Sequence, residues 1–421
     1  MVTVQPITNW AGNVVFSTRT LHRPTSVEQV QEVVADADHL RVLGTGHSFS
    51  AVADSDRALL TVADLPRRIE IDADRRSVTV SAGTRFGELA QVLDPAGWAL
   101  HNLGSLPHIS IGGAVATGTH GSGVTNGCLA SAVNAIELVT PSGELVHLAR
   151  GDENFDGSVV TLGSLGVVTA LGLDIQPRYE IEQRVYDRMF LSALRVNLRD
   201  VLSAAYSVSV FLTWRRPFAE QVWVKHRTDA GEWPHGRDWL GATLAPGQRN
   251  PVPGQDPGFA TQQGGAPGPW HTRLPHFRLE FTPSAGEELQ TEYLLPIENA
   301  VEALDVLSGL ADRLAPNLHI CELRTVAADE LWLSEAYRQD SIALHFTWLP
   351  DPEAARPVIT ALEEGLAPLG ARPHWGKVFS TEPADVAARY PRFDDARALA
   401  RAYDPDGKFR NAFTARYLDG V

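Results

Sequence analysis

The stretch 102–127 constrains the fold more than any other segment, because it contains seven glycines in 26 residues. Glycine at this density marks backbone that adopts positive φ angles or approaches another group closely. A flexible linker is the alternative, but Ile109, Ile111 and Val115 are β-branched apolar residues, which are unusual in solvated linkers. We therefore expect an ordered loop that lies against a ligand or another part of the chain.

A second glycine turn follows a predicted strand at residues 40–43. Gly44 and Gly46 come directly after that strand, so successive backbone N–H groups can point into one concavity, which suits a pyrophosphate. His47 stands at the rim of the turn, although a turn histidine taken alone is more often structural. The chain has no G-x-G-x-x-G motif, because the nearest match has Asn126 in place of its third glycine. Two glycine loops without that motif favour a flavin held by backbone over a nicotinamide.

Two further predicted strands, 319–325 and 343–348, carry polar side chains at alternate positions. These side chains are Glu322 and Arg324 on the first strand and His345 and Thr347 on the second. Residues two apart share one face of a strand, so pairing of the strands would gather all four in one patch. A solvated sheet face with a cross-strand ion pair is the plainer interpretation. A buried patch of donors and acceptors is what a neutral, hydroxyl-rich substrate needs.

A single lysine, Lys377, follows Gly376 in an aromatic setting. A lone lysine is usually a solvated surface residue. Beside a flavin it has a definite task, because hydride transfer leaves negative charge on the ring system and a fixed cation stabilises it.

Composition and charge restrict the class of protein. The chain has 421 residues, 44% of them apolar, and a formal net charge of −15. At about 100–200 residues per domain, two or three domains are expected. The negative charge repels phosphate backbones and anionic lipid surfaces, so we expect no nucleic-acid and no membrane partner. Residues 1–10 lack the features of a signal peptide, and no apolar run approaches the roughly 20 residues of a membrane span. We expect a cytoplasmic enzyme that is a monomer.

Local patterns predict interspersed strands and helices over the first 175 residues, which is typical of an α+β domain. Ser26 and Gln29 resemble a capping box for a helix that begins at Val27. The other predicted elements are a strand at 77–81, a helix at 86–93, and a hairpin formed by 135–139 and 145–148. The segment 245–269 contains six prolines and six glycines and predicts a long irregular loop. Cys128 and Cys321 are too few for a disulfide framework and are expected to be buried free thiols.

Taken together, these segments resemble the bacterial alditol oxidases, a family of vanillyl-alcohol-oxidase-type flavoproteins. The resemblance is nearly full length and rests on the stretches 9–13, 41–50, 106–123, 321–327, 343–348 and 371–377. The glycine-rich loops are shared by the whole flavoprotein group. The Glu-x-Arg and His-x-Thr strands and the His-Trp-Gly-Lys sequence distinguish the polyol and sugar-lactone oxidases from the rest.

The resemblance implies an α+β, two-domain fold of the vanillyl-alcohol-oxidase (PCMH) type. An FAD-binding domain would span residues 1–175 and be completed by 376–421, and a substrate-binding domain with a mixed sheet would span 176–375. His47 would carry the FAD through a covalent bond from its imidazole to the 8α carbon. Doubly linked relatives use a cysteine near the position of Leu106, so a single link is expected here.

The resemblance also assigns further residues to the cofactor. They are Val42, Leu43, Gly44, Thr45, Gly46, Ser48, Gly104, Ser105, Ser110, Gly113, Ala114, Val115, Ala116, Gly118 and Val168. Gly104 stands beside the expected flavin ring, where an alanine also occurs in this group. The missing Cβ would leave room for dioxygen, but a glycine needed only for the turn explains the residue equally well.

The polyol pocket implied by the resemblance comprises Ser105, Glu322, Arg324, His345, Thr347 and Lys377. We expect Glu322 and Thr347 to bind substrate hydroxyls, and Arg324 and Lys377 to orient the C1 hydroxyl and stabilise the reduced flavin. His345 is the preferred proton acceptor, because imidazole titrates near neutrality. The implied reaction is FAD-dependent oxidation of the terminal hydroxyl of alditols such as xylitol and sorbitol to the aldose, with dioxygen reduced to hydrogen peroxide.

Three alternatives stay open at this point. The first is a lactone oxidase or dehydrogenase of the same flavoprotein type that acts on a gulono- or galactono-lactone. The second is a serine hydrolase that uses Ser48, although Ser50 replaces the second glycine of a nucleophile elbow. The third is a carbohydrate-binding protein without catalysis. We expect no metal site, because His271 and His276 are too far apart around a helix to chelate together and are interpreted as loop or surface histidines.

Overall fold

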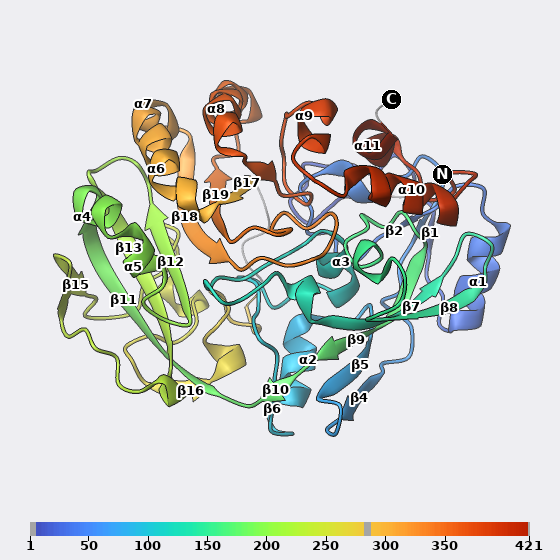
Figure 1. The fold of residues 1–421 in the computed structure, drawn as a ribbon, viewed down its shortest axis with the longest axis horizontal. Helices are drawn as coiled ribbons and strands as arrows, with labels where there is room; N and C mark the ends of the chain where they lie inside the picture. The colour runs from blue at the N-terminus through green and yellow to red at the C-terminus, as the bar shows by residue number, and fades with distance from the viewer. Residues whose placement is uncertain (1–5, 282–287, 420–421) are drawn as a thin grey trace.

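The computed structural model describes residues 6–281 and 288–419. Figure 1 shows two parts side by side, one built from the first 175 or so residues together with the C-terminal helices, the other built on one large sheet. Residues 1–5, for which the sequence predicts no signal peptide, lie outside the described residues. Among the described residues, none of the helices is long and apolar enough to cross a lipid bilayer.

The first part combines a five-stranded antiparallel sheet with a small parallel one. The larger has the order β4-β5-β9-β7-β8, with strands Ile69–Asp72, Ser77–Ser81, Val167–Asp174, Val133–Val139 and Leu145–Ala149. The smaller has the order β1-β3-β2, with strands Leu21–His22, Leu59–Leu60 and Arg41–Val42. A third pair joins β6 (Trp98–Ala99) to β10 (Gln176–Pro177).

The helices of this part are α1 (Val27–Asp36), α2 (Phe86–Leu93) and α3 (Ile111–Ala116). The predicted helix start is confirmed, because the Gln29 backbone N–H donates to Ser26 Oγ at 3.3 Å. The helix at 86–93, the strand at 77–81 and the hairpin of β7 and β8 are confirmed as well, and Gly143 closes the hairpin with a φ of +85°.

The C-terminal helices α9 (Pro383–Ala387), α10 (Phe393–Tyr403) and α11 (Ala412–Thr414) lie against the first part (Figure 1). Their segment contributes Val386, Phe393, Leu399 and Leu418 to the same apolar core as α2, α3 and the five-stranded sheet. The return of the chain to its first part agrees with the expected domain order. The domain boundaries at residues 175 and 376 stay predictions.

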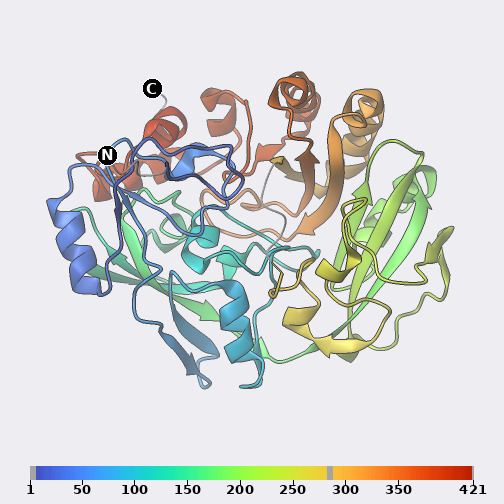
Figure 2. The same cartoon turned by 180° about the vertical axis from the view of Figure 1, so that it is seen from behind.

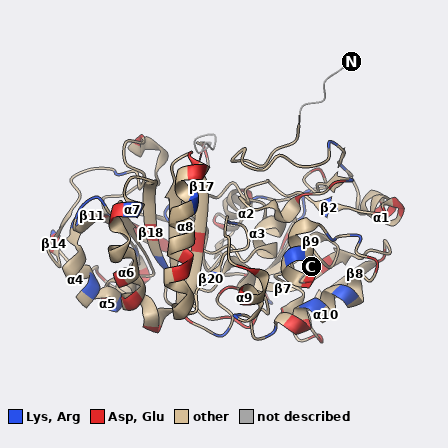
Figure 3. Cartoon of the chain, turned by 90° about the horizontal axis from the view of Figure 1, so that it is seen from above, with Lys and Arg blue, Asp and Glu red and all other residues tan. Residues whose placement is uncertain are grey.

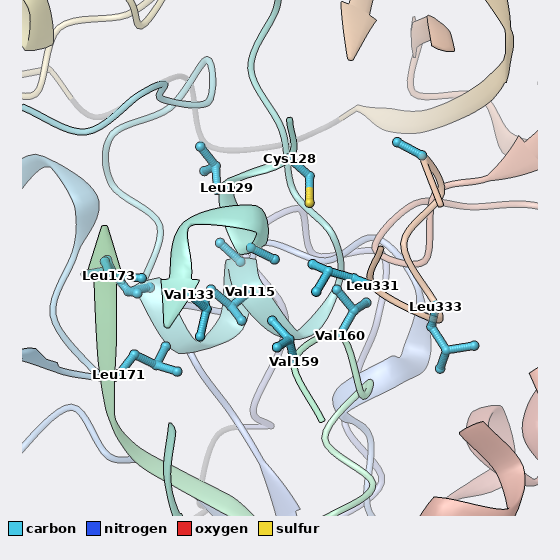
Figure 4. Close-up of a cluster of buried hydrophobic side chains, with 14 of the residues drawn as sticks. Val115, Cys128, Leu129, Val133, Val159, Val160, Leu171, Leu173, Leu331 and Leu333 are labelled. Carbon is cyan, nitrogen blue, oxygen red and sulfur yellow. The ribbon is translucent and has the colours of Figure 1, made fainter. Parts of the chain in front are cut away.

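Apolar side chains fix α3, a short helix that lies inside the glycine-rich stretch 102–127. Figure 4 shows Val115 of this helix among Cys128, Leu129, Val133 and Val159, with Leu331 and Leu333 approaching from the other part of the chain. Cys128 is buried here as a free thiol, and Cys321 is a second buried free thiol, as expected. Burial of this helix face anchors the glycine-rich backbone next to it.

The second part is built on a sheet of order β14-β15-β11-β13-β12-β18-β19-β17-β20, with β16 also paired to β11. Its longer strands are β11 (Glu180–Phe190), β13 (Phe218–Arg227), β12 (Ser207–Leu212), β18 (Leu318–Val326), β19 (Ser341–Trp348) and β17 (Leu289–Pro296). Its short strands are β14 (Asp238–Trp239), β15 (Ala242–Leu244), β16 (Pro267–Pro269) and β20 (Arg372–Pro373).

The strand pairs described in this sheet are antiparallel, so the mixed sheet expected here is wrong in that detail. β12 and β13, for example, are consecutive strands joined only by residues 213–217, whereas a parallel pair needs a crossover of about a dozen residues or more. The α+β class and the two-part architecture are otherwise as expected.

Helices cover one face of the large sheet and leave the other to a cavity. The covering helices are α4 (Leu191–Val196), α5 (Leu198–Leu202), α6 (Ala300–Gly309), α7 (Ala311–Leu314) and α8 (Pro352–Leu366). Leu323, Leu344 and Phe346 point into the core beneath these helices. Because strand side chains alternate, Glu322 and His345 face the opposite side.

The segment 245–269 is largely irregular, as predicted, apart from a short 3-10 helix at Pro257–Phe259 and strand β16. Seen from behind, residues 245–281 lie between the large sheet and α2 (Figure 2). Its Asn250, Val252 and Phe259 line the central cavity, so this loop forms part of the site.

Charged residues of both signs occur on the outer helices. Figure 3 shows acidic and basic positions together on α8 and on α10. Glu353 and Arg356 on α8, and Asp394 and Arg397 on α10, form ion pairs within their helices.

Candidate active site

A cavity of about 600 Å³ lies between the glycine-rich loops of the first part and the uncovered face of the large sheet. Both sets of residues that the sequence singled out line it. The predicted polyol residues Ser105, Glu322, Arg324, His345, Thr347 and Lys377 all contribute to its wall. His47 and Lys377 both line it, so the structure brings together positions that are 330 residues apart in the chain.

The predicted cofactor residues line the other end of the cavity, with one exception. Those that line it are Val42, Leu43, Gly44, Thr45, Gly46, His47, Ser48, Gly104, Ser105, Ser110, Gly113, Ala114, Val115, Ala116 and Val168. Gly118 is the exception, since it does not line the cavity. Its φ is +69°, and a Cβ at this position would lie 2.2 Å from Glu335 Oε2, so this glycine is needed for close packing against Glu335.

The two glycine turns touch and form a cradle of backbone. A Cβ on Gly44 would lie 2.6 Å from Ser110 Oγ, and a Cβ on Gly113 would lie 3.0 Å from the same atom. Thr45 N donates to Ser110 Oγ at 3.3 Å, and Ser110 N donates to Thr45 Oγ1 at 3.2 Å. These contacts hold the two turns together. A long, backbone-lined cleft of this kind fits a dinucleotide such as FAD.

His47 is held from several sides. Its Nδ1 lies 3.0 Å from Thr45 Oγ1, and its ring stacks on Trp10 with centroids 5.4 Å apart. The residues around it are fixed by Asn9, whose Nδ2 donates to the Ser48 carbonyl, and by Asn13, whose Nδ2 donates to the Phe49 carbonyl. Burial lowers the pKa of His47 to about 4, so its imidazole is neutral at physiological pH.

The polar patch of the large sheet has the register that the sequence predicts. Glu322 on β18 and His345 on β19 are directly opposite each other, and Thr347 pairs with Ile320. Arg324 Nη1 donates to Ser105 Oγ at 3.4 Å, which links the sheet to the glycine-rich loop. All four predicted side chains are buried, so the solvated-face interpretation is excluded.

Charges in this patch are balanced by close contacts. Burial alone would raise the pKa of Glu322, but Arg324 and His276 outweigh it and hold that pKa below its usual value. Burial lowers the pKa of Lys377 and lowers that of His345 to about 3. Glu322 is therefore ionised and His345 neutral near pH 7. The expectation that His345 titrates near neutrality is wrong, because burial disfavours its charged form.

Sequence reasoning missed several residues of the site. They are Gln290 and Glu292 on β17, His276 in the loop before β17, His120 in the glycine-rich stretch and His374 beside Trp375, all of which line the cavity. Glu292 accepts a hydrogen bond from Arg324. His276, interpreted from the sequence as a loop or surface histidine, lies in a loop and is buried against Glu322. Gln290 and Glu292 are polar residues two positions apart on strand β17, so the sequence pattern could have indicated that they share a face. His276 lies in an irregular loop, where no such pattern exists.

Among the described residues, His120, Glu292 and His374 bring potential ligand atoms within 4.8 Å of one another. Arg324 already donates to Oε1 of Glu292. Because that guanidinium carries a positive charge at the same oxygen, it opposes binding of a second cation there. The three residues form a buried polar cluster at the wall of the cavity.

Comparison with known proteins identifies the class. Residues 19–149 match the family model of the FAD binding domain, and residues 286–417 match that of D-arabinono-1,4-lactone oxidase. The fold is similar to that of a cholesterol oxidase from B. sterolicum, with a TM-score of 0.79 at 15% identity over 98% of this chain and 96% of the other. The chain is thus an FAD-dependent oxidoreductase with the vanillyl-alcohol-oxidase type of fold.

Curated relatives give the family. An alditol oxidase from Streptomyces sp. is 50% identical over 419 residues, which cover 98% of this chain and 99% of the relative. An L-gulono-1,4-lactone dehydrogenase from Mycobacterium tuberculosis is 29% identical over 97% of this chain and 98% of its own length. The chain belongs to the alditol oxidase family.

Proposed function

We propose that this protein oxidises the terminal C1 hydroxyl of an alditol, such as xylitol or sorbitol, to the aldose, with FAD as the oxidant and dioxygen as the final acceptor. The observation that carries the proposal is the convergence of Glu322, Arg324, His345 and Lys377 on the cavity that the glycine turns also line. The 50% identical alditol oxidase supports the same substrate class. When bound, the flavin accepts a hydride from C1 and passes the electrons to dioxygen, which leaves as hydrogen peroxide.

Substrate hydroxyls are bound by the patch on β18 and β19. The ionised Glu322 accepts hydrogen bonds from hydroxyls, and Thr347 on the neighbouring strand can both donate and accept. Arg324 and Ser105 are joined at 3.4 Å and lie where the sheet meets the glycine-rich loop, so they orient the C1 hydroxyl toward the cofactor end of the cavity. Lys377 supplies a positive charge at the same wall, which favours the arrival of negative charge there.

His345 is the proposed acceptor of the hydroxyl proton. Its Nε2 lies 3.1 Å from Gln290 Oε1, while its Nδ1 is buried and has no hydrogen-bond partner in the described residues. An unpartnered buried nitrogen is costly unless a substrate group pairs with it. A C1 hydroxyl that donates to Nδ1 would satisfy that nitrogen and place its proton on a neutral base.

The cofactor link is proposed to be a single covalent bond from His47. A neutral imidazole has a lone pair available for bond formation, and the pKa of about 4 keeps His47 neutral. Residue 106 is a leucine, which cannot provide a second link. If this is correct, the yellow colour survives acid precipitation, and the flavin mass is found on the proteolytic peptide that contains His47. Flavin that is released into the acid supernatant would contradict the covalent bond.

The reaction is tested with the purified yellow protein. Anaerobic xylitol is expected to bleach the visible flavin absorption, and readmitted air is expected to restore it with release of hydrogen peroxide. The second candidate, oxidation of a gulono- or galactono-lactone, is favoured by the match of residues 286–417 to the lactone oxidase model. Bleaching by lactone but not by xylitol or sorbitol would replace the alditol with that substrate.

The setting of the reaction is proposed from charge and composition. A net charge of −15 repels phosphates, so the partners are a small polyol and dioxygen, with no nucleic acid and no membrane. We place the enzyme in the cytoplasm as a monomer. Sedimentation at the mass of one chain, 45.8 kDa, is the expected result.

A further inference from the structure

A buried lysine, Lys225, lies behind the substrate patch, which is the polar patch of Glu322, Arg324, His345 and Thr347. Lys225 has no role in the proposed mechanism. It projects from β13 and is 1% exposed. In the described residues its ammonium contacts the carbonyl oxygens of Leu274 and Pro275 and lies 3.2 Å from His276 Nδ1. Burial of an ammonium costs free energy, so its place beside a histidine calls for a physical explanation.

His276 connects this lysine to the substrate patch. Its Nε2 lies 2.8 Å from Glu322 Oε1. The imidazole is packed edge-on against Phe211 and Trp223, with centroids 5.4 Å and 5.3 Å away, so its ring cannot turn freely. Lys225, His276 and Glu322 thus form a continuous chain from the sheet interior to the cavity wall.

The donor roles along this chain follow from chemistry. An ammonium can only donate, so His276 Nδ1 accepts from Lys225. Burial lowers the pKa of His276 to about 4, with Lys225 acting in the same direction, so the ring is neutral and carries its proton on Nε2. His276 therefore donates to Glu322.

The contacts of Glu322 are one-sided. His276 Nε2 and Arg324 Nε, at 2.8 Å and 3.6 Å, both face Oε1. Within the described part of the chain these are its side-chain partners, which leaves Oε2 for a ligand. Lys225 does not line the main cavity, and the small cavity of about 10 Å³ beside it is too small for a polyol.

We propose that Lys225 and His276 are positioning residues for substrate recognition: Lys225 fixes the proton of His276 on Nε2, and His276 anchors Glu322 Oε1 so that Oε2 faces the hydroxyls of the substrate. This inference rests on the proposed binding of a polyol at Glu322. It predicts that the chain controls how tightly a polyol binds more than how fast it reacts once bound.

The pH dependence follows from the groups that face Lys225, which are His276, Glu322 and Arg324. Burial lowers the pKa of Lys225 to about 7, Arg324 lowers it further and Glu322 opposes the shift. Below that pH the ammonium holds the His276 proton on Nε2. Above it the neutral amine can accept a hydrogen bond from Nδ1–H, so the tautomer with its proton on Nδ1 becomes populated. The Nε2 lone pair of that tautomer faces the Glu322 carboxylate, and polyol binding weakens.

The test compares two substitutions of His276 in the holoenzyme. The Gln side chain of His276→Gln can place an N–H near the position of Nε2, whereas His276→Leu has no donor. His276→Leu is expected to raise the KM for xylitol about tenfold to a hundredfold, with a much smaller change in the rate of flavin reduction at saturating xylitol. His276→Gln is expected to restore most of the loss. Equal KM values for His276→Leu and the parent, or equal losses in both variants, would overturn the proposal.

Lys225→Met tests the lysine. Met fills a similar volume without charge, so the KM for xylitol is expected to rise and its pH dependence near 7 to disappear. His226→Gln is the matched control, because His226 is a buried histidine on the same strand whose Nε2 contacts the Gly231 carbonyl instead of the site. Its KM should equal that of the parent. If Lys225→Met does not fold, the pair of variants at residue 276 decides the question.

A measurement without substrate separates this inference from the proposed function. In protein labelled with ¹⁵N-histidine, His276 should give the spectrum of a neutral ring protonated at Nε2, and Lys225→Met should shift it toward a mixture of tautomers. A parent enzyme that no alditol reduces would refute the proposed function while leaving this result intact. A ring protonated at Nδ1 in the parent would refute the inference alone.

Discussion

Lys377 donates a hydrogen bond from its ammonium to the amide oxygen of Gln290. Because an ammonium can only donate, this contact fixes which way the amide points. Gln290 Nε2 correspondingly donates to Glu288 Oε1 at 2.7 Å. The same amide oxygen lies 3.1 Å from His345 Nε2, so that nitrogen must carry the proton. Lys377 thereby sets the tautomer of the proposed base through Gln290, and Nδ1 keeps its lone pair.

Substitution of Gln290 tests this arrangement. Gln290→Leu removes the acceptor for His345 Nε2–H, so we expect the rate constant of anaerobic flavin reduction by xylitol to fall about tenfold or more. Gln290→Glu keeps an oxygen in the same place and is expected to retain most of the rate. Stopped-flow absorbance measures both variants. Identical losses in the two would show that the tautomer of His345 is not controlled from residue 290.

Lys377 itself is expected to matter more than its contact with Gln290. Removal of a fixed cation from a buried site where charge develops typically costs about 100-fold to 1,000-fold in rate. Lys377→Met should show that loss in flavin reduction while still binding FAD, and Lys377→Arg should recover part of it. Near-normal reduction of Lys377→Met by xylitol or sorbitol would remove the lysine from the proposed mechanism.

The sequence predicts a residue of this site only where the surrounding residues follow a regular pattern. Glu322 and His345 were predicted because alternation along a strand fixes which side chains share a face, and the register confirmed that pairing. Gly118, which the resemblance assigns to the cofactor, does not line the cavity and packs against Glu335, a neighbour that the sequence pattern does not indicate. His276 could not be found, since its loop has no period and only tertiary packing brings it to Glu322.

Gly104 is a case where the structure separates two explanations that the sequence left equal. Its φ lies outside the left-handed region, and an added Cβ would meet its nearest neighbours at 3.7 Å, which is ordinary contact. Turn geometry therefore does not require this glycine, and the space next to it opens into the cavity.

We expect Gly104→Ala to fold and to be more stable by about 0.4–1 kcal/mol, because alanine restricts the unfolded chain. Anaerobic reduction by xylitol should be unchanged and reoxidation by dioxygen slower, since the Cβ narrows the approach. Chemical denaturation and stopped-flow reoxidation measure the two effects. Faster reoxidation in this variant would contradict a passage for dioxygen at this position.

The buried neutral histidines also determine how the fold responds to acid. Burial lowers the pKa of His345 to about 3 and that of His276 to about 4, from the ordinary value of 6.5. At a pH between the lowered pKa of each histidine and 6.5, that histidine is protonated in the unfolded chain but not in the folded chain. Stability must therefore fall as the pH falls below 6.5, by about 1.4 kcal/mol per pH unit for each histidine.

His345→Gln isolates one of these contributions. Between pH 4.5 and 6 the free energy of unfolding of this variant should depend on pH less steeply than that of the parent, by about 1.4 kcal/mol per pH unit. Urea unfolding at several pH values measures both slopes, and the carboxylates common to both proteins cancel in the comparison. Parallel slopes would mean that His345 is already protonated in the folded protein at pH 6, and a protonated imidazole cannot accept the proton of the C1 hydroxyl.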